Sequence, residues 1–209
     1  MNYLHLLLKK IKERIVLKFS KNLPIEIKAP LLDGPKIHLG CGDVDLQGWI
    51  NIDARNAPHV HIRTESLNLQ EFQENSVSEI YLCHVLEHFS FQEVKDLLSS
   101  FHSKMHKGAV LRISVPDFSA LVELYKISGD LKKIEQPLMG GQDYKFNFHK
   151  SVFDQDFLNN LLVDAGFSEV LQWSPLAEFG KEIPDWSSGY VEYKSQRYPI
   201  SLNLKAYKE

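Results

Sequence analysis

The sequence predicts an α/β fold built on a mainly parallel sheet, because short apolar runs alternate with amphipathic helical patterns along the chain. The expected strands span residues 36–39, 49–53, 79–83, 110–115, 170–173 and 202–207. The expected helices span residues 92–105, 117–125 and 154–165. Helical crossovers of this kind connect parallel strands, so the sheet is expected to be doubly wound, with helices on both faces. The run over 202–207 alternates apolar and polar residues, as an edge strand would.

The boundaries of these elements follow from residues that start or stop them. The first strand runs into Gly40, and the strand over 110–115 ends at Pro116, which cannot donate a sheet hydrogen bond. Asp117 can cap the next helix, and Gly166 can end the helix over 154–165. The helix over 92–105 is indicated by apolar residues at helical spacing: Val94, Leu97, Leu98, Phe101 and Met105.

One domain accounts for most of the 209 residues, which suffice for a single sizeable core. We assign residues 36–209 to this domain and the proline-containing residues 22–35 to a connector. Residues 1–21 carry six basic side chains against one acidic and place apolar residues on one helical face. This basic amphipathic helix either docks on the domain or attaches reversibly to an anionic membrane surface.

Charge and cysteine usage narrow the function classes. A formal charge of −3 provides no general attraction to nucleic acid. Two cysteines, Cys41 and Cys83, are too few for a disulfide framework. We therefore expect a cytoplasmic protein, located peripherally at the inner face of the membrane if residues 1–21 attach to it rather than dock on the domain. The sequence does not indicate an oligomeric state.

A candidate ligand site lies in the stretch IHLGCGDVDLQGWINID, residues 37–53. Gly40 and Gly42 allow a tight turn that brings backbone N–H groups close to a ligand. Asp53, at the end of the next strand, can accept hydrogen bonds from the two hydroxyls of a ribose. A third glycine is missing after Gly42, and two aspartates would face a phosphate, which argues against dinucleotides and nucleoside triphosphates. A nucleoside with a cationic tail, such as S-adenosylmethionine, fits better.

Four motifs in order resemble class I S-adenosylmethionine-dependent methyltransferases. They are HLGCGDVDLQGWINID, NSVSEIYLCHVLEHF, KGAVLRISVPDF and LLVDAGF. They are most similar to a small bacterial branch associated with surface-polysaccharide synthesis, and the resemblance covers residues 36–209. It implies a Rossmann-like sheet of seven strands in which the strand over 202–207 is antiparallel.

The resemblance also implies the cofactor contacts. They are expected at Leu39, Gly40, Cys41, Gly42, Asp53, Glu65, Ser66, Cys83 and His84. Residues 39–42 would lie under the methionine part, Asp53 would hold the ribose, and Glu65 with Ser66 would contact the adenine. The two cysteines would line the pocket as free thiols.

Two departures from the family's pattern affect the first motif. His38 stands where an acidic residue is usual, so we expect the methionyl ammonium to contact backbone carbonyls or Asp43. The stretch between the glycines and Asp53 is short, which leaves little room for the family's first helix.

The run His84-Val85-Leu86-Glu87-His88 also spells H-x-x-E-H, a pattern of zinc peptidases. On a helix, His84 and His88 would share one face, as a zinc pair does. The run follows directly on a strand at the expected cofactor pocket, so we favour a site without metal. His84 would then contact cofactor or substrate, and Glu87 and His88 would support the loop.

Three residues are candidates for catalysis. Methyl transfer to a hydroxyl requires alignment and removal of a proton, for which histidine is suited. His149, in the glycine- and aromatic-rich loop GGQDYKFNFHKSVF, is favoured as the base ahead of His84. Asp117 is the third candidate, with helix capping as the alternative role.

We expect a methyltransferase acting on a small-molecule or carbohydrate acceptor, such as a sugar hydroxyl of a polysaccharide, glycolipid or nucleotide-sugar. A non-catalytic methyltransferase-like scaffold and an H-x-x-E-H zinc hydrolase are the alternatives. Cofactor binding without turnover would identify the scaffold, whereas bound metal without affinity for the cofactor would identify the hydrolase.

Overall fold

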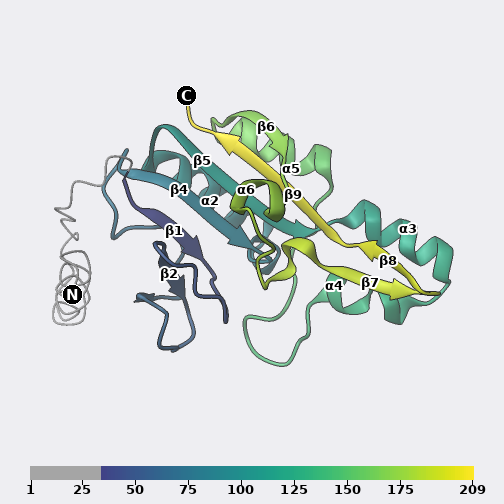
Figure 1. Cartoon of the computed structure of the whole chain (residues 1–209). Helices are drawn as coiled ribbons and strands as arrows, with labels where there is room; N and C mark the ends of the chain where they lie inside the picture. The colour runs from purple at the N-terminus through teal and green to yellow at the C-terminus, as the bar shows by residue number, and fades with distance from the viewer. Residues whose placement is uncertain (1–33) are drawn as a thin grey trace.

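A computed structural model describes residues 34–209; the predicted helix over residues 1–21 lies outside this range. The described chain forms a seven-stranded sheet in the order β3-β2-β1-β4-β5-β9-β6 (Figure 1). Its strands are β1 (Lys36–Leu39), β2 (Ile50–Asp53), β3 (Ile62–Arg63), β4 (Val77–Cys83), β5 (Met105–Pro116), β6 (Ser168–Gln172) and β9 (Ser201–Tyr207). The first five pair in parallel, and β9 is antiparallel to both β5 and β6. The predicted parallel sheet with one antiparallel strand is confirmed.

The predicted edge position of the strand over 202–207 is wrong, because β9 lies between β5 and β6. Its alternation has another cause. Leu202, Leu204 and Ala206 face the core, while the intervening side chains face a less completely covered side of the sheet. A strand that is covered on one face alternates wherever it lies in the sheet.

The helices form where the sequence predicts them, and shorter elements fill the connections. The α-helices are α2 (Phe91–Lys104), α3 (Phe118–Ser128), α4 (Glu135–Met139), α5 (Gln155–Asp164) and α6 (Pro175–Phe179). The 3-10 turns are η1 (Leu86–His88), η2 (Leu131–Lys133) and η3 (Trp186–Ser188). A separate hairpin is formed by β7 (Tyr190–Tyr193) and β8 (Gln196–Pro199). Ser90 and Glu93 close a capping box that starts α2.

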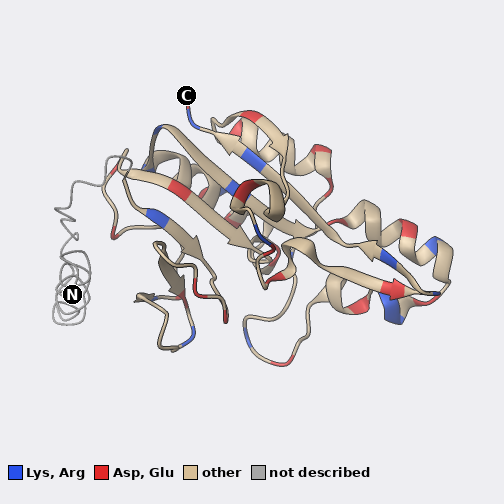
Figure 2. Ribbon diagram, viewed as in Figure 1, with Lys and Arg blue, Asp and Glu red and all other residues tan. Residues whose placement is uncertain are grey.

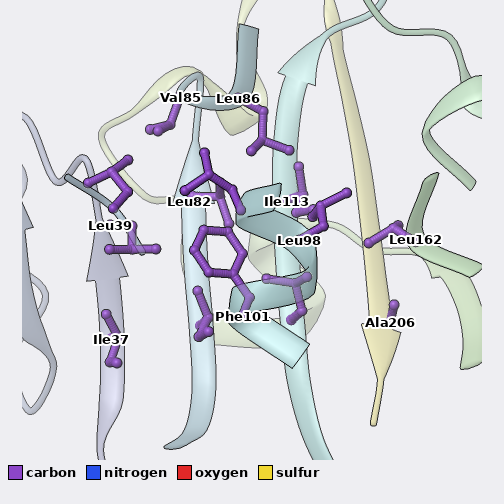
Figure 3. Close-up of a cluster of buried hydrophobic side chains, with 14 of the residues drawn as sticks. Ile37, Leu39, Leu82, Val85, Leu86, Leu98, Phe101, Ile113, Leu162 and Ala206 are labelled. Atoms are coloured by element: carbon purple, nitrogen blue, oxygen red, sulfur yellow. The ribbon is translucent and has the colours of Figure 1, made fainter. Parts of the chain in front are cut away.

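The main core lies between the sheet and the pair α2 and α5. Leu98 and Phe101 of α2 project onto the strands beside Leu82 and Ile113 (Figure 3). These four side chains are completely buried. Burial of one such side chain contributes about 1.5–3 kcal/mol, so this face accounts for much of the folding free energy.

The opposite face of the sheet carries α6 and a smaller aromatic core (Figure 1). Tyr81 of β4 is its centre, packed edge-on against Trp173 and hydrogen-bonded through its hydroxyl to Asp185 at 2.5 Å. No helix separates β1 from β2, because residues 40–49 form only turns, which agrees with the short connection in the sequence.

Candidate functional site

The chain reverses its direction of travel across the sheet at β1, which has β2 on one side and β4 on the other. In open parallel sheets, ligands bind outside the carboxyl ends of the strands at such a switch point. The glycine turn follows β1, Asp53 ends β2, and the H-x-x-E-H run follows β4. The topology therefore brings the predicted motifs to one edge of the sheet.

The glycine turn and Asp53 are in direct contact. The backbone N–H of Gly42 donates to Oδ2 of Asp53 at 2.8 Å. Gly40 and Gly42 have φ of +60° and +57°, a conformation that favours glycine. A Cβ at Gly40 would lie 2.4 Å from the Val85 side chain. The turn is thus compact enough for backbone and carboxylate to face the same ligand.

Arg55 is a site residue that sequence reasoning missed. Its backbone N–H donates to Oδ1 of Asp53 at 2.8 Å, and its Nε lies 3.3 Å from the same oxygen. Asp43 lies 3.5 Å from the guanidinium. The only signal in the sequence was an arginine two positions after a strand-ending aspartate, which is not specific. The Arg55 side chain is 42% exposed and can leave Asp53 when a ligand arrives.

His38 is buried in β1 and faces the aromatic core. Its ring stacks on Tyr81, and its Nδ1 lies 3.2 Å from Oδ1 of Asn51. Burial lowers the pKa of His38 to about 4. A neutral imidazole at this position cannot replace the carboxylate that is usual in the resembling family, which leaves backbone carbonyls and the exposed Asp43 for an ammonium group.

Cys41 and Cys83 are free thiols, as expected, at the ends of the neighbouring strands β1 and β4. Burial raises the pKa of Cys41 to about 12 and also raises that of Cys83. Both thiols are therefore protonated at neutral pH and behave as small apolar groups. Leu39 is completely buried in the core, so it positions the turn through packing.

Glu65 and Ser66 follow β3, at the far side of the same sheet edge. Both are exposed, and Glu65 forms an ion pair with Lys145 at 2.6 Å. Lys145 belongs to the loop that also carries His149. The loop over residues 140–150 therefore reaches from the H-x-x-E-H run to the residues that follow β3.

His84 occupies a strained position directly after β4. Its φ is +53°, which is rare for a residue with a side chain. Its Nε2 lies 2.9 Å from Oγ of Ser201, and its ring lies 6.2 Å from that of Trp186. Burial lowers the pKa of His84 to about 3. The H-x-x-E-H run is a 3-10 turn rather than an α-helix, so His84 and His88 do not form a helical zinc pair.

Glu87 and His149 are brought together from distant parts of the chain. Nε2 of His149 lies 4.0 Å from Oε1 of Glu87, and the ring of His88 packs edge-on against that of His149 at 4.9 Å. Burial raises the pKa of Glu87 to about 8 and lowers that of His149 to about 4. His149 also lines a small pocket with Pro116, Phe118 and Phe153. A polar cluster thus borders an apolar pocket.

Asp117 adopts its alternative role, the helix cap. Its Oδ1 accepts hydrogen bonds from the backbone N–H groups of Ser119 and Ala120 at the start of α3. A carboxylate that caps a helix already has its hydrogen-bond partners. Asp117 therefore has a structural role as the cap of α3, between Pro116 and Phe118, which line the pocket, and its catalytic role stays a prediction.

Comparison with known proteins places the fold. No protein-family model matches the sequence, and no curated protein matches it significantly. An S-adenosylmethionine-dependent methyltransferase from Archaeoglobus fulgidus has a TM-score of 0.54 and 15% identity, over 99% of this chain and 100% of that chain. Another from Thermotoga maritima has a TM-score of 0.53 and 16% identity, over 84% and 82%.

A third match is the complex between the Trm112 methyltransferase activator of Haloferax volcanii and a methyltransferase, with a TM-score of 0.51, 10% identity and coverage of 84% and 82%. No helix within residues 34–209 is long and apolar enough to cross a membrane. At these sequence identities the likeness establishes architecture, and the described chain has the fold of S-adenosylmethionine-dependent methyltransferases.

Proposed function

We propose that this protein is an S-adenosylmethionine-dependent methyltransferase that methylates a hydroxyl of a small-molecule or carbohydrate acceptor. The observation that carries the proposal is the contact between Gly42 and Asp53 at the switch point of the sheet. The glycine turn offers backbone groups to the methionine part of the cofactor, and the carboxylate accepts hydrogen bonds from the ribose hydroxyls. Arg55 leaves the carboxylate when the ribose binds.

The remaining cofactor contacts follow from the same edge of the sheet. Glu65 and Ser66, which follow β3, are the residues proposed to contact the adenine. Cys83 and His84, after β4, lie on the other side of the glycine turn. This arrangement supports a cofactor that runs along the strand ends, with its methyl group directed toward the cluster at Glu87 and His149.

Cofactor binding is tested by calorimetry with S-adenosylmethionine. Asp53→Ala removes the ribose acceptor and is expected to weaken binding by about 1.5–3 kcal/mol, the range for a hydrogen bond to a charged group. Asp164→Ala, at the exposed end of α5, is the matched control and is expected to bind like the wild type. Unchanged affinity in a folded Asp53→Ala protein would refute the assignment.

The acceptor is proposed to occupy the pocket beside His149, with its reacting hydroxyl against the cluster. Trp186, which is 53% exposed near His84, offers a flat face on which a sugar ring can stack. Carbohydrate as the acceptor class, and a link to surface-polysaccharide synthesis, rest on the resemblance of the motifs. Removal of the hydroxyl proton is assigned to the histidine cluster, with His149 ahead of His84.

The acceptor side is tested with methyl-labelled cofactor and extracts of the producing cell, followed by mass spectrometry of the product. His149→Ala is expected to keep cofactor affinity and to lower turnover about 10²–10⁴-fold. His106→Ala, at the opposite end of β5, is the control. Normal turnover of His149→Ala would remove this histidine from the reaction. Cofactor binding with no acceptor in any extract would favour the scaffold alternative.

A further inference from the structure

Three side chains of the kinds that bind metal ions converge at the acceptor pocket. Glu87, His88 and His149 each place one potential ligand atom within 4.8 Å of the other two. Glu87 and His88 lie in η1, and His149 lies in the loop before α5. Backbone hydrogen bonds hold the loop beside η1, because the carbonyl of Glu87 accepts from the N–H groups of Lys150 and Ser151 at 2.7 and 3.2 Å.

Glu87 is buried without the partners that a buried carboxylate needs. It is 1% exposed, and neither of its carboxylate oxygens accepts a hydrogen bond from any residue between 34 and 209. Its Oε1 lies 3.4 Å from Nδ1 of His84 and 4.0 Å from Nε2 of His149. Burial of a polar group without a hydrogen bond is costly, and a bound cation would satisfy both the charge and the lone pairs.

The two histidines are oriented from behind by backbone carbonyls. Nδ1 of His88 lies 3.3 Å from the carbonyl oxygen of Phe148. The ring of His149 donates to the backbone of Pro137 and Leu138. A histidine that binds a metal typically donates its other ring N–H to such a carbonyl. The His88 ring is also hydrogen-bonded to the backbone of His84, and Nε2 of His149 is directed toward Glu87.

We propose that Glu87, His88 and His149 bind a divalent first-row transition cation that holds the hydroxyl of the acceptor. Two imidazole nitrogens and one carboxylate oxygen form a ligand set that suits such ions, and three protein ligands leave a coordination position for substrate. Bond lengths of about 2.0–2.2 Å place ligand atoms roughly 3–3.5 Å apart, so the side chains close by about an ångström when the ion binds. The acceptor part of this inference rests on the proposed function, whereas the ligand set does not.

A bound cation would stabilise the alkoxide that a hydroxyl must become before it can accept a methyl group. The acceptor O–H loses its proton to water as its oxygen coordinates. The oxygen then attacks the methyl carbon of the sulfonium, the C–O bond forms as the C–S bond breaks, and the bonding electron pair remains on the sulfur as a neutral thioether. With the cation bound, His149 would act as its ligand in place of the role as base given above, so that His149→Ala lowers turnover under either assignment.

The site is tested on the full-length protein, stripped with a chelator and titrated with Co²⁺ by visible absorption and with Zn²⁺ by calorimetry. One equivalent is expected to bind per chain. Glu87→Gln and His149→Gln are each expected to weaken binding by more than the roughly 10–100-fold lost when a residue that only orients a metal ligand is removed. His106→Gln, a histidine at the other end of β5, is the matched control and is expected to bind like the wild type.

Absence of stoichiometric binding, or wild-type affinity in folded Glu87→Gln and His149→Gln proteins, would overturn the inference. If Glu87→Gln does not fold, His88→Gln decides, because the ring of His88 is only partly buried. Calorimetry with S-adenosylmethionine in chelator separates the two proposals. Cofactor binding without metal binding overturns the cation site alone, whereas metal binding without cofactor binding overturns the proposed function alone.

Discussion

One group of charged side chains crosses the sheet, a second group of titratable side chains lies beyond the end of β4, and only the first group is internally paired. The first, which we name the charge network, crosses β1, β4, β5 and β9 beneath α6 (Figure 2). It consists of Lys36, Glu79, Arg112, Glu178 and Lys205. The second is the cluster around Glu87, beyond the carboxyl end of β4.

Every carboxylate of the charge network has a cation on each side. Glu79 lies 2.8 Å from Lys36 and also binds Arg112. Glu178 lies 2.7 Å from both Arg112 and Lys205, and the hydrogen bond from Lys205 lowers its pKa. These contacts satisfy the charges within the fold, so the network needs no further ligand.

Glu87 differs from these carboxylates because it has no lysine or arginine partner among residues 34–209, although it is more deeply buried than Glu79. The difference separates two uses of a carboxylate. A carboxylate that is fully paired stabilises the packing of the strands, so its removal lowers the free energy of unfolding. A carboxylate that is buried without partners contributes little to stability and is available to a ligand. Such carboxylates are typical of functional sites.

The largest effect on stability is expected for Glu79→Gln. The substitution leaves Lys36 and Arg112 without their shared carboxylate in a site where the Glu79 side chain is 10% exposed. Breaking a buried pair costs about 3–5 kcal/mol, which urea denaturation would detect as a lower midpoint at constant slope. Glu123→Gln, which breaks a surface pair with Lys126, is the control and should cost less than about 1 kcal/mol. Equal losses in the two variants would show that the network adds nothing.

A smaller effect is expected for Tyr81→Phe. The hydroxyl of Tyr81 donates to Asp185 at 2.5 Å, so this carboxylate has a neutral partner in place of a cation. Loss of a hydrogen bond to a charged group costs about 1.5–3 kcal/mol. Thermal unfolding would place this variant between Glu79→Gln and wild type, with Tyr198→Phe as the control at a more exposed hydroxyl. A Tyr81→Phe protein with the same melting temperature as the wild type would contradict this ranking.

The smallest effect is expected for Glu87→Gln in the presence of chelator. The carboxylate has no hydrogen bond to lose within the described residues, so the free energy of unfolding should change by less than about 1 kcal/mol. The same variant should lose the rise in melting temperature that added Zn²⁺ gives the wild type. A loss as large as that of Glu79→Gln would mean that Glu87 is structural and would remove the contrast between the two groups.

The sheet could be predicted because local patterns and topology agree. The runs before Gly40 and Pro116 are strands as expected, and their order follows from the motifs. The hairpin of β7 and β8 was missed because its turn uses Lys194 and Ser195 at φ of +49° and +61°, where a recognisable turn has glycine or asparagine. β3 was missed because it has only two residues.

The site was predictable only where its residues follow strands directly. Asp53 and Gly42 belong to one short stretch, so their contact could be foreseen. The meeting of Glu87 with His149 could not, because it depends on the path of residues 140–150 across the sheet edge. Sequence reasoning therefore treated Glu87 as a support and considered His84 with His88 as a metal pair, whereas the structure groups His88 with His149.

The ion pair between Lys145 and Glu65 has a kinetic consequence. The loop over 140–150 is bound to α4 at its start and to the carbonyl of Glu87 at its end, while Lys145 in its middle forms this exposed pair with Glu65, which follows β3. An exposed ion pair contributes about 0–1 kcal/mol, so an adenine arriving beside Glu65 can displace Lys145 at little cost. In the proposed methyltransferase, cofactor binding would therefore free the middle of the loop that carries His149. Substrate addition would then be ordered, with the cofactor binding first.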